Sequence, residues 1–408
     1  MKQLRNYPKF TVTQKAERAL AGGHPWVYAD EVLRAEPCEN GAIADVVSEK
    51  GRYLGTGLVS EKSKIRVRVF SRNASDTFDE AFWRRRFAHA WAYRKTVLRP
   101  DELACCRVVF GEADFFPGLT VDRFGPVLSV QVLSAGAERL KPVWLPLLVD
   151  VLRADGQPIE GVYERNDVAI RALEGLGQYK GWYDLSAMGL AAPQSALVPI
   201  TENGVRYTVD VENGQKTGFF LDQKYNRAAV ARLAKGKAVL DCFTHTGSFA
   251  LNAALGGAKK VTAVDVSEAA VAMARRNAEE NGVAGVMECV AADVFELLPG
   301  LAPHAYDFII LDPPAFTKSH KTLANALRGY KEINYRAMKL LPRGGYLATC
   351  SCSHFATEEA FCKMLRSAAR DAGVQLRLIE ARGPAPDHPV LWGVPETAYL
   401  KFYLFQVV

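Results

Sequence analysis

The sequence predicts an α/β protein whose C-terminal half is a doubly wound, mostly parallel sheet. From about residue 200 onward, short apolar runs alternate with segments in which apolar residues recur at helical spacing. Continuous apolar runs are typical of strands that are buried on both faces of a parallel sheet. The chain ends in two extended stretches, 374–382 and 398–408, which indicate an antiparallel hairpin at one edge of that sheet.

A series of strand signals runs through this half of the chain. In 237–255 and 259–282 a strand is followed by a turn and a helix, and Ser267 is placed to cap the second helix, with Glu268 in its first turn. The series continues in 286–298, 306–316 and 344–354.

The N-terminal half has a different pattern. Short strand signals and turn glycines predict a compact β-rich module, which a polar break at 71–76 ends. A helix follows, with a core-facing stripe of Trp83, Phe87, Ala90 and Trp91, and strand-rich stretches then complete a mixed α+β domain. We therefore predict three domains, with the bounds 1–73, 74–190 and 191–408.

Composition favours a cytoplasmic protein with no membrane partner. The first twenty residues carry charges throughout, unlike a signal peptide, and no apolar stretch approaches the length of a membrane span. The eight cysteines have no regular spacing, which indicates reduced thiols. The formal charge of +6 permits an anionic partner without requiring one.

Basic residues at every second position mark one segment of the β-rich module. On a strand they form one face, opposite a mostly apolar face of Ser63, Ile65, Val67 and Val69. Either this is an ordinary solvated surface or it is a stripe that follows RNA phosphates. The RNA-binding candidates are Lys62, Lys64, Arg66 and Arg68, and Arg72 continues their register.

Aspartates end four of the predicted strands of the C-terminal sheet, where ligands of such sheets bind. They are Asp241, Asp265, Asp293 and Asp312. The turn after the first strand is D-x-F-x-x-x-G and lacks the glycine-rich fingerprint that holds a pyrophosphate. Asp265 suits a ribose diol and Asp293 an adenine edge. This combination fits an adenosine ligand without phosphates, and points to S-adenosylmethionine (SAM). No metal site is predicted.

Four motifs, GQKTGFFLDQKYNR, DCFTHTGSF, LDPPAF and SCS, together resemble the bacterial class I SAM-dependent methyltransferases that make 5-methylcytosine in large-subunit ribosomal RNA. The resemblance implies an N-terminal PUA domain, a central α+β domain and a Rossmann-like methyltransferase domain. It also implies the cofactor-binding residues Gln223, Asn226, Asp241, Thr246, Gly247, Asp265, Asp293 and Asp312. The sequence departs from the family at Phe115 and Phe116, where the family pattern leads us to expect a glycine and a small or aliphatic residue.

Cys350 and Cys352 follow a predicted strand and face the same side, so strand parity does not separate them. Cys352 lies further toward the carboxyl end, where ligands bind, and we predict that it is the nucleophile and Cys350 is structural. The resemblance agrees, because the family places a Cys-Ser pair here, with an acidic residue six positions later, and Glu358 stands there. Ala315 occupies the position of a second family cysteine, which leaves the base that removes the C5 proton unassigned.

The resulting hypothesis is a SAM-dependent cytosine-C5 methyltransferase that acts on 23S ribosomal RNA, with Cys352 and Asp312 as catalytic residues. Methylation of an exocyclic amine, methylation of uridine at C5, and an RNA-binding ribosome-assembly factor with an idle SAM cleft stay open as alternatives. The sequence does not decide the target nucleotide or the oligomeric state, and a homodimer is one option.

Overall fold

The computed structural model describes residues 5–317 and 319–408. The chain forms two compact units, each assembled from segments that are distant in sequence. The first holds the chain as far as Ile200, with Val209–Leu221 and Pro386–Thr397; the second holds Thr201–Thr208, Asp222–Ala385 and Ala398–Val408. The β-rich and α+β segments both lie in the first unit, so the domain boundaries predicted near residues 73 and 190 remain a prediction.

The N-terminal part of the first unit is a sheet with the strand order β2-β6-β5-β4-β1-β3. Helix α1 (Gln14–Ala21) begins where the side chain of Thr13 accepts a hydrogen bond from the amide of Ala16, and it packs Leu20 into the core of this sheet. The strands are β1 (Lys9–Val12), β2 (Trp26–Tyr28), β3 (Val32–Ala35), β4 (Ile43–Ser48), β5 (Tyr53–Val59) and β6 (Ile65–Ser71). This part is β-rich, as the sequence predicts.

The basic segment is shorter as a strand than predicted. Because β6 begins at Ile65, Lys62 and Lys64 precede it, and both are exposed. Arg66 lies in the strand and is half-buried. These three side chains remain available to a partner.

Arg68 does not lie on an exposed face. Its side chain donates from Nη2 to Oε1 of Glu174 at 2.8 Å, and the two residues are 8% and 2% exposed. The hydroxyl of Ser60 also donates to this carboxylate. The prediction that Arg68 contacts RNA as part of a surface stripe is therefore wrong, because its charge is already paired inside the protein.

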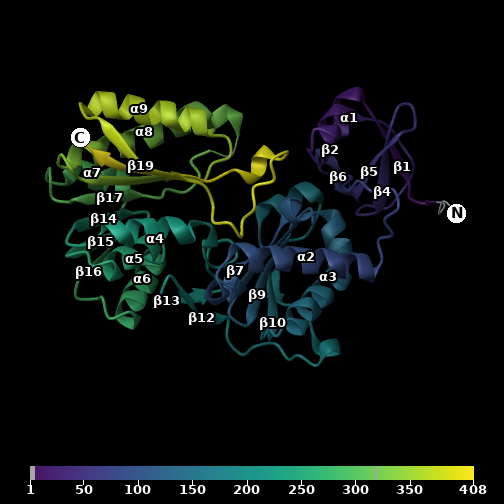
Figure 1. Ribbon diagram of the computed structural model, residues 1–408, viewed down its shortest axis with the longest axis horizontal. Coiled ribbons are helices and arrows are strands. Elements are labelled where there is room, and N and C mark those ends of the chain that lie inside the picture. The colour runs from purple at the N-terminus through teal and green to yellow at the C-terminus, as the bar shows by residue number, and fades with distance from the viewer. Residues whose placement is uncertain (1–4, 318) are drawn as a thin grey trace. The chain divides into compact units, whose positions relative to one another are not determined.

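The second sheet of this unit has the strand order β11-β10-β9-β8-β7, and helices α2 (Glu80–Val97) and α3 (Ala135–Ala154) lie beside each other against it (Figure 1). The predicted aromatic stripe of α2 is confirmed as core, since Trp83, Phe87 and Trp91 are at most 2% exposed. The strands are β7 (Cys105–Phe110), β8 (Leu119–Phe124), β9 (Val127–Val132), β10 (Gly161–Arg165) and β11 (Lys180–Trp182).

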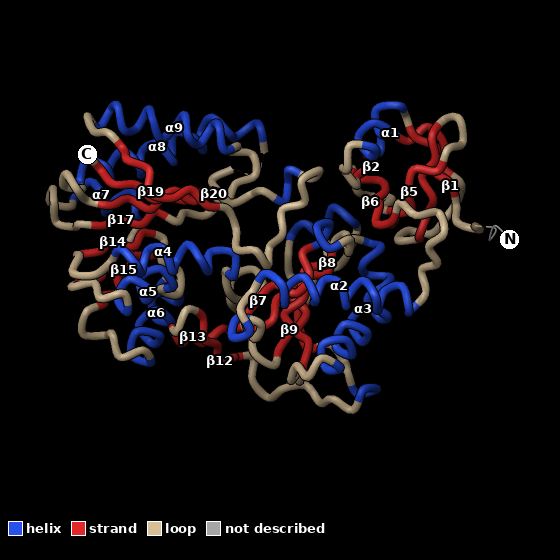
Figure 2. Tube along the Cα trace, in the orientation of Figure 1, coloured by secondary structure: helices blue, strands red, loops and turns tan. Residues whose placement is uncertain are grey.

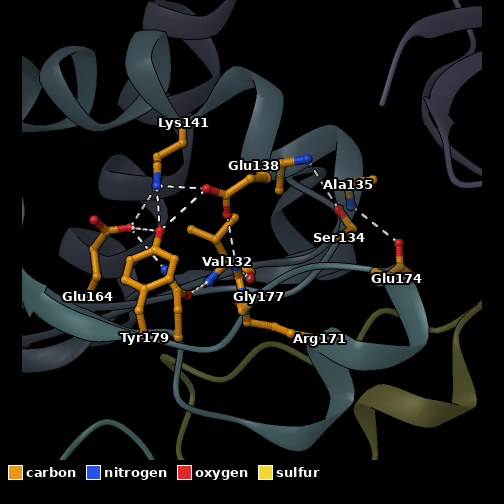
Figure 3. A network of polar contacts seen from close by, with 12 residues as sticks. Val132, Ser134, Ala135, Glu138, Lys141, Glu164, Arg171, Glu174, Gly177 and Tyr179 are labelled. Carbon is orange, nitrogen blue, oxygen red and sulfur yellow. Dashed lines mark hydrogen bonds and ion pairs between the residues drawn. The ribbon is translucent and has the colours of Figure 1, made fainter. Parts of the chain in front are cut away.

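A polar network ties α3 to this second sheet (Figure 3). Lys141 donates to Glu138 at 2.8 Å, and Arg171 donates to the other oxygen of Glu138 at 2.9 Å. Glu174, which lies in the same turn region as Arg171, accepts a hydrogen bond from the amide of Ala135 at 3.2 Å. The carboxylate that pairs with Arg68 is therefore also fixed to the start of α3.

Phe115 and Phe116, where the sequence departs from the family pattern, differ in backbone conformation and burial. Phe115 adopts a left-handed backbone with φ 61°, the region that favours glycine. Phe116 is fully buried and stacks on Phe87, with ring centroids 4.1 Å apart.

The sheet of the second unit has the order β16-β15-β14-β17-β18-β20-β19. Figure 2 shows strands of this sheet in red, among them β17, β19 and β20. The strands from β14 to β18 pair in parallel, and β20 pairs antiparallel with both β18 and β19. This confirms the doubly wound sheet and its edge hairpin. The strands are β14 (Ala238–Cys242), β15 (Lys260–Asp265), β16 (Met287–Ala291), β17 (Phe308–Leu311), β18 (Tyr346–Ser351), β19 (Leu376–Arg382) and β20 (Lys401–Val407).

Helices cover both faces of this sheet. In Figure 1 the helices α4, α5 and α6 lie on one face, and α7, α8 and α9 lie on the other. Ser267 caps α6 as predicted, because its hydroxyl accepts a hydrogen bond from the amide of Ala270 at 3.3 Å. The helices are α4 (Lys224–Leu233), α5 (Ser248–Leu255), α6 (Glu268–Glu280), α7 (Val294–Gly300), α8 (Leu323–Leu340) and α9 (Glu358–Ala372). Within 5–317 and 319–408, no helix combines the length and the apolar character needed to cross a membrane.

Replacing Arg68 with alanine should destabilise the first unit. The change leaves the Glu174 carboxylate buried without its cation, which typically costs about 3 kcal/mol or more. We expect the urea midpoint of this unit to fall, whereas Lys64→Ala, which removes an exposed cation from the same segment, should change the free energy of unfolding by about 0.5 kcal/mol or less. Equal midpoints for the two variants would contradict a buried Arg68–Glu174 pair.

Candidate active site

The candidate site lies in the second unit, at the carboxyl edge of its parallel strands. Asp241 lies near the end of β14, Asp265 is the last residue of β15, and Asp312 directly follows β17. Cys352 follows the last residue of β18. Because these strands are parallel, the structure brings the four predicted residues to one edge of the sheet.

Asp241 is fully buried and has an uncommitted oxygen. Its Oδ2 accepts hydrogen bonds from the hydroxyl of Thr244 at 2.5 Å and from the amide of Ala250 at 3.0 Å. Its Oδ1 has no hydrogen-bond partner within the described part of the chain. Burial raises the pKa of Asp241 to about 7, and the nearby charge of Asp312 raises it further. Such an orphaned acceptor is typical of a site that awaits a polar ligand.

The turn after β14 requires glycine at position 247. Gly247 has φ 84°, and a Cβ atom there would come within 2.9 Å of Met287 Cε and 3.1 Å of Ala274 Cβ. The hydroxyl of the preceding Thr246 is buried and, among the described residues, has no hydrogen-bond partner. The turn at Thr246 and Gly247 therefore places the Thr246 hydroxyl at the site, as a second buried polar atom without a hydrogen-bond partner besides Asp241 Oδ1.

Asp265 and Asp293 both make local backbone contacts. Asp265 accepts hydrogen bonds from the amide of His245 at 2.9 Å and from that of Ser267 at 3.0 Å. Asp293 is exposed and caps α7 by accepting from the amide of Phe295 at 2.7 Å. Each carboxylate thus has a structural task, and each also retains acceptor capacity for a ligand.

Asp312 is linked to the segment that precedes the first strand. Gln223 donates from Nε2 to Asp312 Oδ1 at 2.9 Å, and Asn226 donates to Gln223 Oε1 at 2.6 Å. The thiol of Cys350 is a further hydrogen-bond partner of Asp312. Burial raises the pKa of Asp312 to about 7, and the charge of Asp222 adds to this effect. Gln223 and Asn226, which only the family resemblance had indicated, therefore meet a predicted catalytic residue.

The two cysteines have different environments. Cys350 lies within β18 and is fully buried, and burial raises the pKa of its thiol well above the usual value. Cys352 is half-buried, and its Sγ lies 4.0 Å from the carbonyl oxygen of Pro313, in the loop that follows Asp312. All eight cysteines of the chain are free thiols.

Lys401 is a site residue that the sequence reasoning missed. Its side chain is buried between β18 and β20, and its Nζ donates to the carbonyl oxygens of Ser353 at 2.6 Å and Tyr399 at 2.8 Å. Burial lowers the pKa of Lys401 to about 8, while the nearby Cys352 and Glu358 oppose this shift. The available signal was a single lysine within an otherwise apolar strand, LKFYLF.

These residues fit an adenosine ligand with a positively charged centre. The carboxyl edge offers several carboxylates and two orphaned polar atoms, and its first turn lacks the glycine-rich amides that hold a pyrophosphate. Across 5–317 and 319–408, no cluster of three or more His, Cys, Asp or Glu side chains could hold a metal ion.

Comparisons with known proteins agree with this geometry. Residues 10–72 match a family model described as a PUA-like domain, and residues 182–406 match one described as S-adenosylmethionine-dependent methyltransferase. The chain is 39% identical to the ribosomal RNA large subunit methyltransferase I of Klebsiella pneumoniae, over 98% of this chain and 99% of that protein. The protein of the same name from Salmonella enteritidis is also 39% identical, over 98% of each chain.

Among solved structures, the chain is similar to a protein from Streptococcus mutans that is described as a SAM-dependent methyltransferase. The TM-score is 0.79 at 22% identity, and the match covers 98% of this chain and 99% of that chain. This similarity supports the order of the sheets along the whole chain.

Replacing Asp241 with asparagine should change how stability depends on pH. The folded-state pKa of Asp241, about 7, is above its ordinary value of 3.8, so the native chain binds more protons than the unfolded chain between these pH values. The stability from this group is therefore present in acid and is lost as pH rises through its folded pKa.

Urea unfolding of the second unit at about pH 5 and about pH 8 measures this effect. The ligand-free wild type should lose more stability between the two conditions than Asp241→Asn does. Asp293→Asn, a change at an exposed carboxylate, should keep the wild-type difference. An unaltered difference in Asp241→Asn would show that this carboxyl titrates normally.

Proposed function

Because the chain belongs to the S-adenosylmethionine-dependent methyltransferases and matches large-subunit ribosomal RNA methyltransferases over its full length, we propose that it methylates carbon 5 of a cytosine in 23S ribosomal RNA. The observation that carries the proposal is the position of Cys352, half-buried at the carboxyl edge of β18 and next to the loop that follows Asp312. The chain's free thiols agree with a cytoplasmic location.

The cofactor supplies an electrophilic methyl group on a sulfonium centre. Asp265 is proposed to bind the ribose diol, Asp293 the adenine edge, and the orphaned atoms of Asp241 and Thr246 the remaining polar groups. Gly247 keeps the turn after β14 tight, because a Cβ atom there would meet Met287 and Ala274. Gln223 and Asn226 complete the proposed site through their hydrogen bonds with Asp312.

Cys352 is proposed to be the nucleophile. Carbon 5 of cytosine is too weak a nucleophile to take a methyl group unaided, so the Cys352 thiolate attacks carbon 6 and makes the ring enamine-like. Carbon 5 then forms its bond to the methyl group while the bond between that methyl group and the sulfonium sulfur breaks, and S-adenosylhomocysteine would leave as the neutral thioether. Loss of the proton from carbon 5 and cleavage of the bond between carbon 6 and sulfur regenerate the ring and the thiolate.

Asp312 is proposed to bind the edge of the base. With its pKa raised to about 7, the carboxyl group is partly protonated at neutral pH, and so can donate to N3 and accept from the N4 amine of cytosine. Donation to N3 withdraws electrons from the ring and favours attack at carbon 6. The base must leave its stack to reach such a site.

Lys401 is proposed to position and activate the loop that carries the nucleophile. Its hydrogen bond to the carbonyl oxygen of Ser353 fixes the residue next to Cys352. A buried cation near a thiol favours the thiolate, which is the reactive form. The carboxylate of Glu358 also acts on the Lys401 ammonium group. It accepts a hydrogen bond from the hydroxyl of Tyr403 at 2.7 Å.

Mapping 5-methylcytosine in 23S ribosomal RNA, by mass spectrometry, from cells with and without this chain tests the function. One modified cytosine should disappear with the chain and return on complementation. A missing methyl group on an exocyclic amine or on uridine would replace the proposal with one of those reactions. SAM binding with no change in any RNA would favour an assembly factor.

Separate alanine variants of the two cysteines test the mechanism. Cys352→Ala should bind SAM with unchanged affinity and transfer no methyl group, because the nucleophile is absent. Cys350→Ala should retain activity and lose stability, since it leaves a small cavity in β18. Methyl transfer from radiolabelled SAM and calorimetric SAM binding measure the two effects. An active Cys352→Ala enzyme would eliminate covalent catalysis at this residue.

The solvent-accessible part of the basic segment, Lys62, Lys64 and the half-buried Arg66, should contribute to RNA affinity through phosphates. Changing Lys62, Lys64 and Arg66 together to alanine should weaken binding of all RNA sequences and lower the slope of log affinity against log salt by about 2 to 3. Arg85→Ala on α2 removes an exposed cation elsewhere and serves as the control. A salt slope equal to that of the wild type would make the segment an ordinary solvated surface.

A further inference from the structure

One cavity of the first unit has no role in the proposed chemistry. Its volume is about 680 Å³, which is within the range of small-molecule sites. The walls come from the N-terminal sheet, from α2, from the turn that precedes β8, and from a loop far along the chain. They include Gly23, Arg72, Arg86, Phe115, Trp392 and Gly393.

Trp392 presents its ring to solvent from a fixed loop. The residue is 96% exposed, an unusual state for the largest apolar side chain. Several hydrogen bonds hold the loop, among them one from the amide of Val394 to the carbonyl of Leu391 at 2.8 Å and one from the amide of Leu391 to Thr397 Oγ1 at 3.0 Å. The backbone that carries the exposed ring is therefore held in place.

Gly393 anchors this loop against the N-terminal sheet module. A Cβ atom at Gly393 would lie 3.0 Å from the Cα of Gly23, so the two backbones touch. His24, next to Gly23, also pairs with Glu396 at 3.3 Å. These contacts fix Trp392 at the rim of the cavity.

Arg86 brings a half-buried cation to the same cavity. Its guanidinium lies over the rings of Phe82 and Phe115, at 4.8 Å and 5.0 Å from their centroids. Its Nη1 donates to the carbonyl oxygen of Phe115 at 3.4 Å. Burial lowers the pKa of Arg86 to about 10, while the charge of Asp76 opposes this shift. Phe115, which is 46% exposed, holds this cation from a backbone conformation that glycine would adopt without strain.

The carboxylates of the cavity already have partners. Glu112 accepts a hydrogen bond from Trp26 Nε1 at 2.9 Å and lies 4.0 Å from Arg68 Nε. Asp76 accepts hydrogen bonds from Ser71 at 2.5 Å and Asn73 at 2.9 Å. These donors are neutral, so Asp76 and Glu112 keep their charges, and the cations of the cavity that can meet a phosphate are Arg86 and the exposed Arg72.

We propose that this cavity binds an unpaired nucleotide of the RNA substrate, with its base stacked on Trp392 and its phosphate on Arg86 and Arg72. An exposed indole on a hydrogen-bonded loop offers a face to any base, and guanidinium groups match phosphate oxygens. Bases are accessible in this way in single-stranded RNA and not within a duplex. The site rests on the proposed function in one respect, namely that the substrate is RNA.

Binding of a fluorescein-labelled single-stranded RNA and of the same strand in a duplex, both to the full chain, tests the site. Trp392→Ala should weaken single-strand binding by about five- to a hundred-fold, while Trp392→Phe, which keeps an aromatic face, should retain most of the affinity. Duplex binding should be the same in both variants. Leu173→Ala, a change at another exposed apolar residue of this unit, should not alter binding.

Two further variants test Arg86 and the Phe115 ring that lies beneath it. Arg86→Gln should weaken single-strand binding and lower the salt slope by about one, whereas Trp392→Ala should leave the slope unchanged. Phe115→Gly suits the φ of 61° and removes the ring under Arg86, so it should weaken binding without unfolding the chain.

The two proposals fail separately. If the wild type methylates 23S ribosomal RNA and Trp392→Ala binds the single strand like the wild type, the nucleotide site is wrong and the cavity serves another occupant. If Trp392→Ala weakens single strand and duplex equally, base stacking is also excluded. If Trp392→Ala selectively weakens single-strand binding in a chain that methylates no RNA, the site stands and the proposed reaction fails.

Discussion

The parallel pairing of β14 with β15 on one side and β17 on the other is the constraint on which the site depends. In this register Asp241 lies opposite Ala263 and Ile310, so the three strands end together. Residues more than a hundred positions apart, such as Asp241 and Cys352, reach one edge because every strand between them runs in the same direction. The hydrogen bond from Gln223 to Asp312 then joins this edge to the segment before α4, which is not part of the sheet.

That edge gathers negative charge in a buried setting, which explains why two of its carboxyl groups hold protons near neutral pH. The charge of Asp312 opposes ionisation of Asp241, and burial opposes it in both residues. A ligand that carries positive charge relieves this repulsion. The same carboxyls that are costly in the free protein are therefore suited to a cationic methyl donor.

The periodicity of the sequence was sufficient to predict the parallel sheet, its edge hairpin and the carboxylates at the strand ends, because these depend on residues close together in the chain. It could not find the partner of Arg68, since Glu174 lies 106 positions away and strand alternation assigns Arg68 to the basic face. Lys401 was missed for a similar reason: its position beside Cys352 follows from the antiparallel return of β20. Long-range pairing, and not local pattern, decides both.

The buried contact among Ser60, Arg68 and Glu174 also limits how this architecture can be rearranged. A fragment that starts after residue 73 would retain Glu174 and its contact with the amide of Ala135 but lose Ser60 and Arg68. It would therefore carry a carboxylate in its core without the paired cation. The N-terminal sheet therefore cannot be exchanged on its own for that of another protein. A chimaera that takes this sheet from a relative must inherit the arginine, the serine and the distant glutamate together, and recombination between homologous genes faces the same restriction.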